Sequence, residues 1–292
     1  MATNQLKVPV LVLGGGTGGL AAALQCARSG TDCLLVTPGP WLGGMLSSSG
    51  VSAPDGNELS AWQTGLWGAL LRELRHRIPE GLDHNWVSCF GFQPAQAEAV
   101  LQAWVSQASQ LQWLPNLALK ELRRRGDRLE SALFNDGDHS LEVNFELLVD
   151  GTELGESLPL ADLPYRLGWE AQELWQEPSA PSQARLSSEA FFLEQPVQSP
   201  TWVVLGQWQG PWDHQLAPAS LARCLSYGRL PGDLVMLNWP LNGNDWHNDP
   251  GAAFSPDPSR RLRQHQGMQA HSLNYLERLS QESGGRLGPA LA

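Results

Sequence analysis

The feature that most constrains the fold is a cluster of glycines close to the N-terminus. Residues 10–36 read VLVLGGGTGGLAAALQCARSGTDCLLV, in which Gly14, Gly16 and Gly19 separate an apolar run from an Ala- and Leu-rich stretch. In a G-x-G-x-x-G loop between a strand and a helix, the first glycine permits a tight turn and the second lets a diphosphate approach the backbone. The third lets helix and strand pack closely. The spacing predicts a dinucleotide-binding loop, with a structural glycine turn as the alternative.

The helix expected after the loop strengthens this prediction. A helix N-terminus presents free N–H groups and about half a positive charge to an anion. Thr17 and Gly18 therefore join the three glycines as predicted contacts. No Lys-Ser or Lys-Thr pair follows the loop, which excludes a Walker-type phosphate loop.

Hydrophobic periodicity around the loop predicts alternating strands and helices. Residues 8–13 and 33–36 have the continuous apolar character of buried parallel strands, and residues 20–28 between them are typical of a helix. These three elements predict a βαβ unit with a right-handed crossover. Further helices are expected over 59–78 and 94–111.

A change of period then indicates three short strands. Runs over 117–123, 129–134 and 141–149 are separated by breaks that contain Gly and Asp, which predicts a three-stranded β-meander. The three arginines at 123–125 indicate a solvated hairpin turn, and the apolar residues 147–149 indicate a central parallel strand. The expected fold class is α/β, a Rossmann-like domain with a parallel sheet and a β-meander crossover, plus a partial substrate region.

The second half of the chain is less regular. Residues 177–200 are rich in Pro, Ser and Gln and indicate a surface excursion. Strands are expected at 201–205 and 233–237, and a helix over 258–281 with no element after it. This organisation predicts a nucleotide-binding domain over 1–155, a substrate-facing region over 156–250 and a C-terminal helical segment over 251–292.

Thr37 departs from the usual dinucleotide-binding pattern. It stands about 20 residues after the loop, where such folds commonly place an acid for the ribose. A threonine hydroxyl still accepts one hydrogen bond, and a neutral bond is roughly half as strong as a charge-assisted one. We expect weakened ribose recognition by Thr37, or a residue that only ends the strand.

Two further stretches carry a resemblance to a known superfamily. WLGGM at 41–45 follows the second strand, and VDGTELG at 149–155 ends the meander. Both resemble segments of FAD-dependent oxidoreductases of the glutathione-reductase-like FAD/NAD(P)-binding superfamily, which also use a β-meander as a crossover. The resemblance implies FAD as the cofactor and adds the predicted contacts Trp41, Gly43, Gly44, Asp150, Gly151 and Thr152.

The stretch NWPLNGND at 238–245 has the same resemblance. Members of the superfamily are longer, and continue past the helix over 258–281 into a further flavin-contacting loop. The resemblance therefore implies a chain truncated at its C-terminus.

Charge and cysteine usage narrow the expected partners and compartment. A net charge of -11 leaves no basic surface for phosphates, so neither nucleic acid nor an anionic membrane is expected as a partner. The apolar run over 8–13 is too short for a signal core or a membrane span. The four cysteines form no CxxC pair, so we expect a cytoplasmic protein without a disulfide framework or a metal site. The oligomeric state stays open.

The chemistry is expected to come from the cofactor. A flavin performs hydride transfer itself, so no diagnostic nucleophile is required. No catalytic residue is identified. The serines at 47–49 lack a G-x-S-x-G context and indicate a polar loop near the cofactor.

Two groups of side chains have open roles. The segment 245–249 concentrates ligand-type side chains, and a metal site there is the alternative to a loop with turn-forming Asn and Asp. His247 within it is a candidate proton donor to the substrate. Tyr165 and Arg166 either line a substrate pocket or are a core tyrosine and a surface arginine.

The sequence therefore predicts an FAD-dependent oxidoreductase that transfers a hydride to or from a small-molecule substrate. A truncated, non-catalytic relative is the first alternative, binding nucleotide weakly or acting as an interaction module. An NAD-binding enzyme is the second alternative, because the glycine loop alone allows it.

Overall fold

The chain divides into two compact units. The first comprises Met1–Pro164 with Arg229–Gly232, and the second comprises Tyr165–Gly228 with Asp233–Ala292. The structure, a computed structural model, describes residues 3–135, 137, 139–212, 219–239 and 243–290. Residues 240–242 of the NWPLNGND stretch thus lie outside the described residues.

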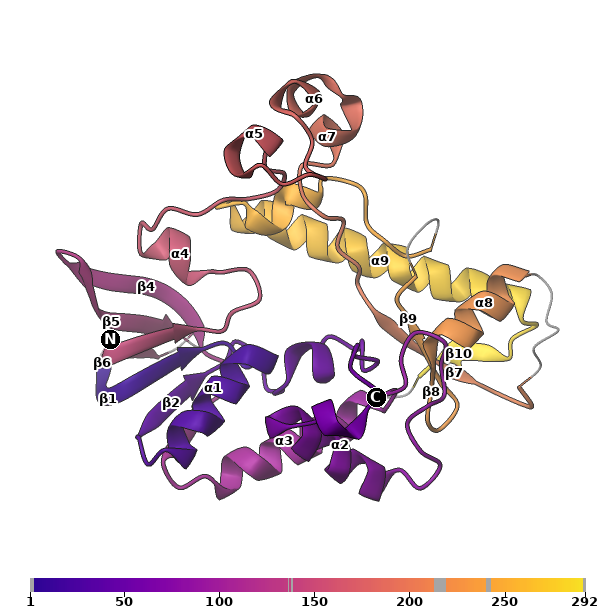
Figure 1. Ribbon diagram of the computed structural model, residues 1–292, viewed down its shortest axis with the longest axis horizontal. Helices are drawn as coiled ribbons and strands as arrows, with labels where there is room; N and C mark the ends of the chain where they lie inside the picture. The colour runs from indigo at the N-terminus through magenta and orange to yellow at the C-terminus, as the bar shows by residue number, and fades with distance from the viewer. Residues whose placement is uncertain (1–2, 136, 138, 213–218, 240–242, 291–292) are drawn as a thin grey trace. The chain divides into compact units, whose positions relative to one another are not determined.

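The first unit is built on a six-stranded sheet of order β3-β2-β1-β6-β5-β4 (Figure 1). Its strands are β1 (Thr3–Leu13), β2 (Cys33–Val36), β3 (Leu111–Leu114), β4 (Ala118–Arg125), β5 (Arg128–Asn135) and β6 (Ser140–Asp150). The first four strands in this order pair in parallel, and β5 pairs antiparallel with both β6 and β4. The mostly parallel sheet and its meander confirm the predicted α/β fold class.

Strand β1 lies inside the sheet, and its last four residues, 10–13, are buried. Val10 and Val12 pack on one face into the core that contains the first helix, and Leu11 and Leu13 pack on the other face. This burial explains why the sequence there is continuously apolar. The strand begins earlier than predicted, at Thr3, because the polar segment before residue 8 pairs with β6 through its backbone.

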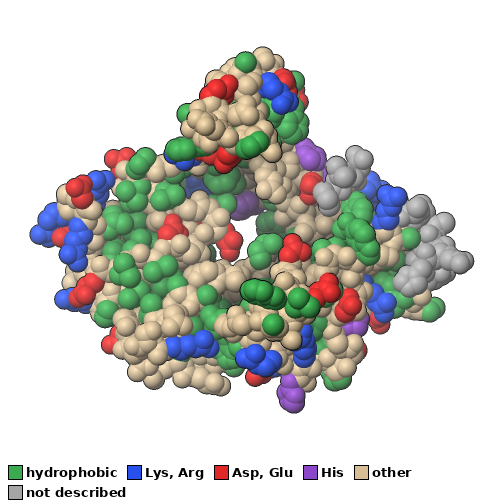
Figure 2. Space-filling model, viewed as in Figure 1, with side chains coloured by type: hydrophobic (Ala, Val, Ile, Leu, Met, Phe, Trp, Pro, Cys, Tyr) green, Lys and Arg blue, Asp and Glu red, His purple; other side chains and the backbone are tan. Residues whose placement is uncertain are grey.

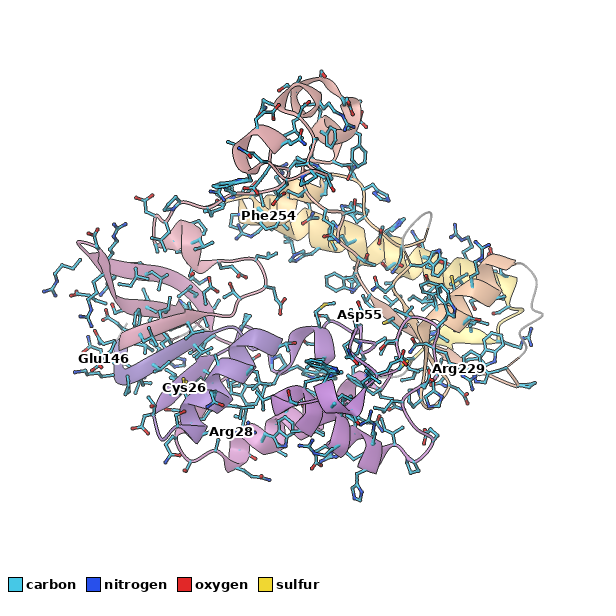
Figure 3. The ribbon with its side chains drawn as sticks, viewed as in Figure 1. Cys26, Arg28, Asp55, Glu146, Arg229 and Phe254 are labelled. Carbon is cyan, nitrogen blue, oxygen red and sulfur yellow. The ribbon has the colours of Figure 1, made fainter. Side chains whose placement is uncertain are left out.

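Helix α1 (Thr17–Arg28) connects β1 to β2, as predicted. Its apolar residues recur at helical spacing on the face that packs into the core, namely Leu20, Ala23, Leu24 and Ala27. Cys26 and Arg28, labelled in Figure 3, lie near its C-terminal end.

The next two helices correct the predicted boundaries. Helix α2 (Gly65–Arg77) begins later than residue 59, because Thr64 before it is extended and the 3₁₀ turn η2 (Ser60–Trp62) is separate. Helix α3 (Pro94–Gln107) ends before residue 111, because Leu111 begins strand β3 and pairs with Cys33 of β2. A continuous helix over 94–111 was therefore wrong.

The predicted meander is confirmed as β4, β5 and β6, and β6 pairs in parallel with the inner strand β1. Leu147 of β6 is nevertheless 56% exposed, so this strand is not buried on both faces along its length. The three arginines at 123–125 end β4 and do not form the turn. They form ion pairs with Glu121, Glu142, Asp127 and Glu130.

The second unit has its own core, formed where strands and two helices pack together. Its strands β7 (Val204–Trp208), β9 (Leu234–Leu237) and β10 (Leu287–Pro289) lie in the order β10-β7-β9. Its longer helices are α8 (Ala219–Gly228) and α9 (Pro258–Glu282), as Figure 1 shows.

Four predictions for this unit are tested by its elements, and the strand expected at 233–237 is confirmed as β9. The helix over 258–281 is confirmed as α9, whose N-cap Asp257 accepts a hydrogen bond from the Ser259 N–H at 2.9 Å. The strand expected at 201–205 begins later, at Val204. The expectation of no element after α9 is wrong, because β10 pairs antiparallel with β7.

Short elements complete the two units. In the first unit these are η1 (Gly44–Leu46), α4 (Ser157–Leu160) and β8 (Arg229–Leu230). In the second they are α5 (Gln172–Trp175), α6 (Gln183–Ser188), α7 (Ala190–Glu194) and η3 (Pro250–Phe254). Among the helices of the described residues, none is both long and apolar enough to cross a membrane.

Candidate functional site

A pocket lies at the carboxyl ends of three adjacent strands in the first unit. Gly14 follows β1, Thr37 follows β2 and Gly151 follows β6, and all three line the pocket. The register brings these ends together, because Leu13 lies beside both Val36 and Asp150. The cavity measures about 470 Å³, which falls in the range of small-molecule sites. Open α/β sheets bind ligands at this edge.

Two glycines of the loop are required by close backbone contacts. Gly14 has a φ of 85°, and a side chain there would collide with the carbonyl of Gly151. Gly19 faces the carbonyl of Gly14 so closely that a Cβ has no room. These contacts hold α1 against the ends of β1 and β6.

The N-terminus of α1 carries no side-chain cap. Its N-cap residue Gly16 is extended, provides no side-chain hydrogen bond, and is followed by a first turn without acidic residues. No side chain caps the first turn, so its N–H groups keep the partial positive charge of a helix N-terminus. Gly18 faces open space, whereas the Thr17 hydroxyl donates to the Gly43 carbonyl at 3.1 Å.

A second loop, residues 38–44, is tied to the first by its backbone. Gly43 has a φ of 108°, and its N–H donates to the Gly15 carbonyl at 2.7 Å. The buried carboxylate of Glu98 on α3 accepts a hydrogen bond from the Leu42 N–H at 3.2 Å. Glu98 was not foreseen as part of the site, because it lies far from Leu42 in sequence and no motif marks it.

The hydroxyl of Thr37 is engaged within the protein. Thr37 is 1% exposed. Its hydroxyl donates to the Gly39 carbonyl at 2.7 Å and accepts from Trp113 Nε1 at 3.0 Å. The threonine therefore bonds the end of β2 to β3 and to the following loop.

Asp150 shapes the loop after β6. One carboxylate oxygen accepts from the Thr152 N–H at 2.9 Å and from the Thr152 hydroxyl at 2.5 Å. The Ser157 hydroxyl donates to the other oxygen. Asp150 thereby orients Gly151 and Thr152, which face the pocket while Asp150 itself does not line it.

The predicted contacts divide into residues that line the pocket and residues that build it. Those that line it are Gly14, Gly16, Thr37, Trp41, Gly44, Gly151 and Thr152. Those that stand behind it are Thr17, Gly18, Gly19, Gly43 and Asp150. Sequence reasoning did not assign as contacts the further lining residues Gly15, Pro38, Gly39, Pro40, Ser48, Glu153 and Glu156. Ser48 had been placed only in a polar loop near the cofactor.

The charge of the pocket is acidic. Among the residues that the structure describes, the charged ones in the lining are Glu153 and Glu156, and none of the lining residues is a Lys, Arg or His. The carboxylate of Glu153 lies directly over Gly16 and Gly44. The carboxylate of Glu156 accepts a hydrogen bond from the Leu154 N–H at 3.3 Å. Positive potential in this pocket therefore comes from backbone N–H groups.

The ligand-type side chains of 245–249 bond to other parts of the second unit. Asp249 forms two short contacts with Arg260, of 2.6 and 2.8 Å, and this guanidinium lowers the pKa of the Asp249 carboxyl. Asp245 accepts a hydrogen bond from the Thr201 hydroxyl. The ring of His247 lies 2.9 Å from the Ser199 hydroxyl through Nδ1. Within the part of the chain that the structure describes, no group of three His, Cys, Asp or Glu could hold a metal ion.

Tyr165 and Arg166 lie at the start of the second unit. Tyr165 is 51% exposed, which excludes the alternative of a core tyrosine. Arg166 forms an ion pair with Glu170 at 3.2 Å and stacks over the Trp175 ring at 4.3 Å.

The cysteines behave as structural thiols. Burial raises the pKa of Cys33 to about 12, with a further contribution from the neighbouring Cys26. Burial also raises the pKa of Cys224, which lies 2.7 Å from the Tyr275 hydroxyl. A thiol held protonated is a poor nucleophile, so neither residue is suited to redox catalysis.

Comparison with known proteins identifies a protein family that matches most of the chain. Residues 9–288 match the protein family described as FAD dependent oxidoreductase. No curated protein matches the chain.

Solved structures give remote similarities. L-proline dehydrogenase from P. horikoshii is 15% identical at a TM-score of 0.32, over 52% of this chain and 24% of that protein. A geranylgeranyl bacteriochlorophyll reductase-like protein from Thermoplasma acidophilum is 14% identical at a TM-score of 0.40, over 55% and 43%. The flavin-dependent monooxygenase PieE, solved with FAD and substrate, is 18% identical at a TM-score of 0.34, over 55% and 33%. The matched region spans less than half the length of each of these proteins.

Proposed function

The chain belongs to the family of FAD-dependent oxidoreductases, and on that premise we propose that it binds FAD in the first unit and catalyses a redox reaction of a small-molecule substrate. The observation that carries the proposal is the pocket between Gly14, Gly16 and Gly151 at the uncapped N-terminus of α1. This combination of space and free N–H groups suits a diphosphate.

The residues present fit the diphosphate portion of FAD. A side chain at Gly16 or Gly44 would project into the space over the loop, so both positions have to be glycine for a ligand to approach the backbone. Trp41 lines the pocket with 41% of its surface exposed and offers an aromatic face to a bound ligand.

When bound, FAD supplies hydride-transfer chemistry of its own. The residues of this chain bind and orient it. Asp150 fixes the direction of Gly151 and Thr152, and Glu98 fixes the loop that carries Gly43 and Gly44 through the Leu42 N–H. His247 as a proton donor to the substrate, and Tyr165 and Arg166 as residues of a substrate pocket, stay proposals, and all three side chains are exposed.

Two finer assignments belong to the same proposal. The β-meander between β3 and β6 supports membership of the glutathione-reductase-like superfamily. The spacing of the four cysteines, without a CxxC pair, supports a reducing cytoplasm as the working compartment.

A second candidate function is nucleotide binding without catalysis. The engaged hydroxyl of Thr37 favours the weak nucleotide binding that this function assumes, because the side chain at the usual ribose position is already bonded to Gly39 and Trp113. The NAD-binding alternative has less support, because the family match specifies FAD.

The test is to purify the chain without added cofactor, record its visible absorbance, and identify any chromophore released by heat. A yellow protein that releases FAD would establish the cofactor. A colourless protein would be titrated with FAD, for which ligand at about 100 times Kd should stabilise the fold by roughly 2.7 kcal/mol. Absence of both colour and stabilisation would reject FAD binding.

A further inference from the structure

One side chain occupies the space that a diphosphate would need. The Glu153 carboxylate lies over Gly16 and Gly44 so closely that a Cβ at either position would collide with it. Gly16 is the N-cap of α1, and Gly44 belongs to the loop that the Gly43 N–H ties to Gly15. The carboxylate therefore stands at the junction of the two glycine loops.

The surroundings of the Glu153 carboxylate favour an anion. The N-terminus of α1 has no side-chain cap and no acidic residue in its first turn. A helix N-terminus of this kind stabilises a nearby anion, whether a carboxylate from another segment or a phosphate. No cation in the pocket lining offers either anion another partner.

A carboxylate and a diphosphate cannot share this place. Like charges a few ångströms apart repel, and the repulsion is stronger where backbone partly excludes water. Glu153 is itself exposed, so its side chain has room to turn away from the loop.

We propose that Glu153 is a built-in competitor of the cofactor, and that a diphosphate ligand binds only by displacing its carboxylate from Gly16. The affinity of the site for a diphosphate is then set by the difference in binding free energy between the diphosphate and the Glu153 carboxylate at the N-terminus of α1. This inference rests on the proposed FAD site, but it applies to any ligand with a diphosphate group.

The pocket supplies a matched control. Glu156 lines the same cavity and carries the same charge, but its carboxylate accepts from the Leu154 N–H rather than lying over Gly16. Neutralising Glu156 changes the net charge of the pocket as much as neutralising Glu153, without vacating the glycine loop.

The experiment measures the affinity of the full chain and of the variants Glu153→Gln and Glu156→Gln by calorimetry. The probes are inorganic pyrophosphate, ADP, FAD and, as a ligand without phosphate, adenosine. Glu153→Gln should bind pyrophosphate, ADP and FAD about tenfold more tightly, a gain of about 1.4 kcal/mol. Its affinity for adenosine should not change, and Glu156→Gln should gain much less.

The outcomes separate this inference from the proposed function. The unchanged chain could bind FAD while Glu153→Gln binds it equally or more weakly. That result would overturn the proposal that Glu153 competes with the cofactor, and would leave the proposed FAD-binding function unaffected. Tighter pyrophosphate binding in Glu153→Gln with no FAD binding by any variant would support the competitor and reject FAD. Equal gains in both variants would show a general charge effect and overturn it. A lack of binding to every probe in all three proteins would overturn both.

Discussion

In the first unit, the residues around the pocket contribute backbone and empty space, whereas in the second unit comparable polar residues bond to one another. Gly14, Gly16 and Gly151 leave room and N–H groups at strand ends. Within the segment 244–249 of the second unit, Asp245 instead accepts a hydrogen bond from Thr201, and Asp249 accepts one from Arg260. A cluster of Asp, Asn and His side chains in a sequence is therefore weaker evidence of a binding site than a cluster of glycines between a strand and a helix.

The largest effect should follow from filling the space in the first unit. Gly16→Val should lower FAD affinity at least about 100-fold, or about 2.8 kcal/mol. Gly16 has a φ of −62° and a ψ of 175°, which valine adopts without backbone strain, and the valine side chain would fill the space over the loop beside the Glu153 carboxylate. The measurement is the Kd for FAD, with thermal unfolding as the check on folding.

Gly18→Ala is the matched control, because nothing lies within 4 Å of a Cβ at that position. It should keep the affinity and leave stability equal or slightly higher, since alanine favours a helix over glycine. A folded Gly16→Val protein that binds FAD as tightly as the unchanged chain would contradict the assignment of the FAD site to the glycine loop of the first unit.

The next largest effect should come from the polar network of the second unit. Asn244 is 1% exposed, donates to the Leu237 carbonyl at 2.9 Å and accepts from the Trp239 N–H at 2.9 Å. Asn244→Ala leaves these groups buried and unpaired, which should lower the free energy of unfolding by about 2–3 kcal/mol. Urea unfolding measures the loss.

The exposed amide of Asn248, in the same segment, provides the control. Asn248→Ala should change the free energy of unfolding by less than about 0.5 kcal/mol. If Asn244→Ala also changed the free energy of unfolding by less than about 0.5 kcal/mol, the hydrogen bonds of Asn244 would not stabilise this segment. A ligand-binding role for its side chains would then be the better explanation.

A smaller effect should sharpen the role of Thr37. Thr37→Val removes the acceptor of the Trp113 Nε1 bond and should cost about 1 kcal/mol of stability. Because the hydroxyl is engaged within the protein, FAD affinity should stay nearly constant. A double-mutant cycle with Trp113→Phe measures the coupling. A large fall in FAD affinity would instead assign the hydroxyl to the ribose.

The smallest effect should come from the Asp249–Arg260 pair. Arg260 lowers the pKa of the Asp249 carboxyl, so the ionised form stabilises the folded protein. This contribution is present above the ordinary carboxyl pKa of about 3.9 and is lost as pH falls through the lowered pKa. Asp249 is nearly half exposed, so solvent and salt weaken the pair.

The measurement is the Tm of the unchanged chain and of Asp249→Asn between neutral and acid pH. The variant should be slightly less stable at neutral pH, and the two curves should converge in acid and in high salt. A gap that widened as pH fell would contradict the assigned sign.

The parts of the fold that the sequence predicted are those with a local signal. β1, α1 and β2 follow from apolar runs and glycine spacing, and the meander follows from its turn residues. β3 was not predicted, and only its first residue, Leu111, was placed in the preceding helix, because LQWL carries no period of its own and its pairing with β2 makes it a strand. β10 was missed because a three-residue strand with Gly and Pro is defined by its neighbour β7.

The candidate site divides in the same way. The glycines of the first loop are marked by their spacing, so the pocket could be placed before the structure was known. Glu98 and Trp113 reach Leu42 and Thr37 from distant segments. Such contacts depend on how α3 and β3 pack, and no pattern within either segment contains that information.

Within the described residues, the sheet of the first unit has an edge at β4. β4 stands at the end of the strand order and ends in the three arginines at 123–125, with Lys120 before them. Figure 2 shows basic and acidic side chains crowded together on this part of the surface. An unpaired strand edge is a template for another chain, and charged side chains along it make such pairing costly. The three arginines, which the sequence placed in a hairpin turn, therefore make edge-to-edge pairing at β4 costly, while the pocket lies at the ends of β1, β2 and β6.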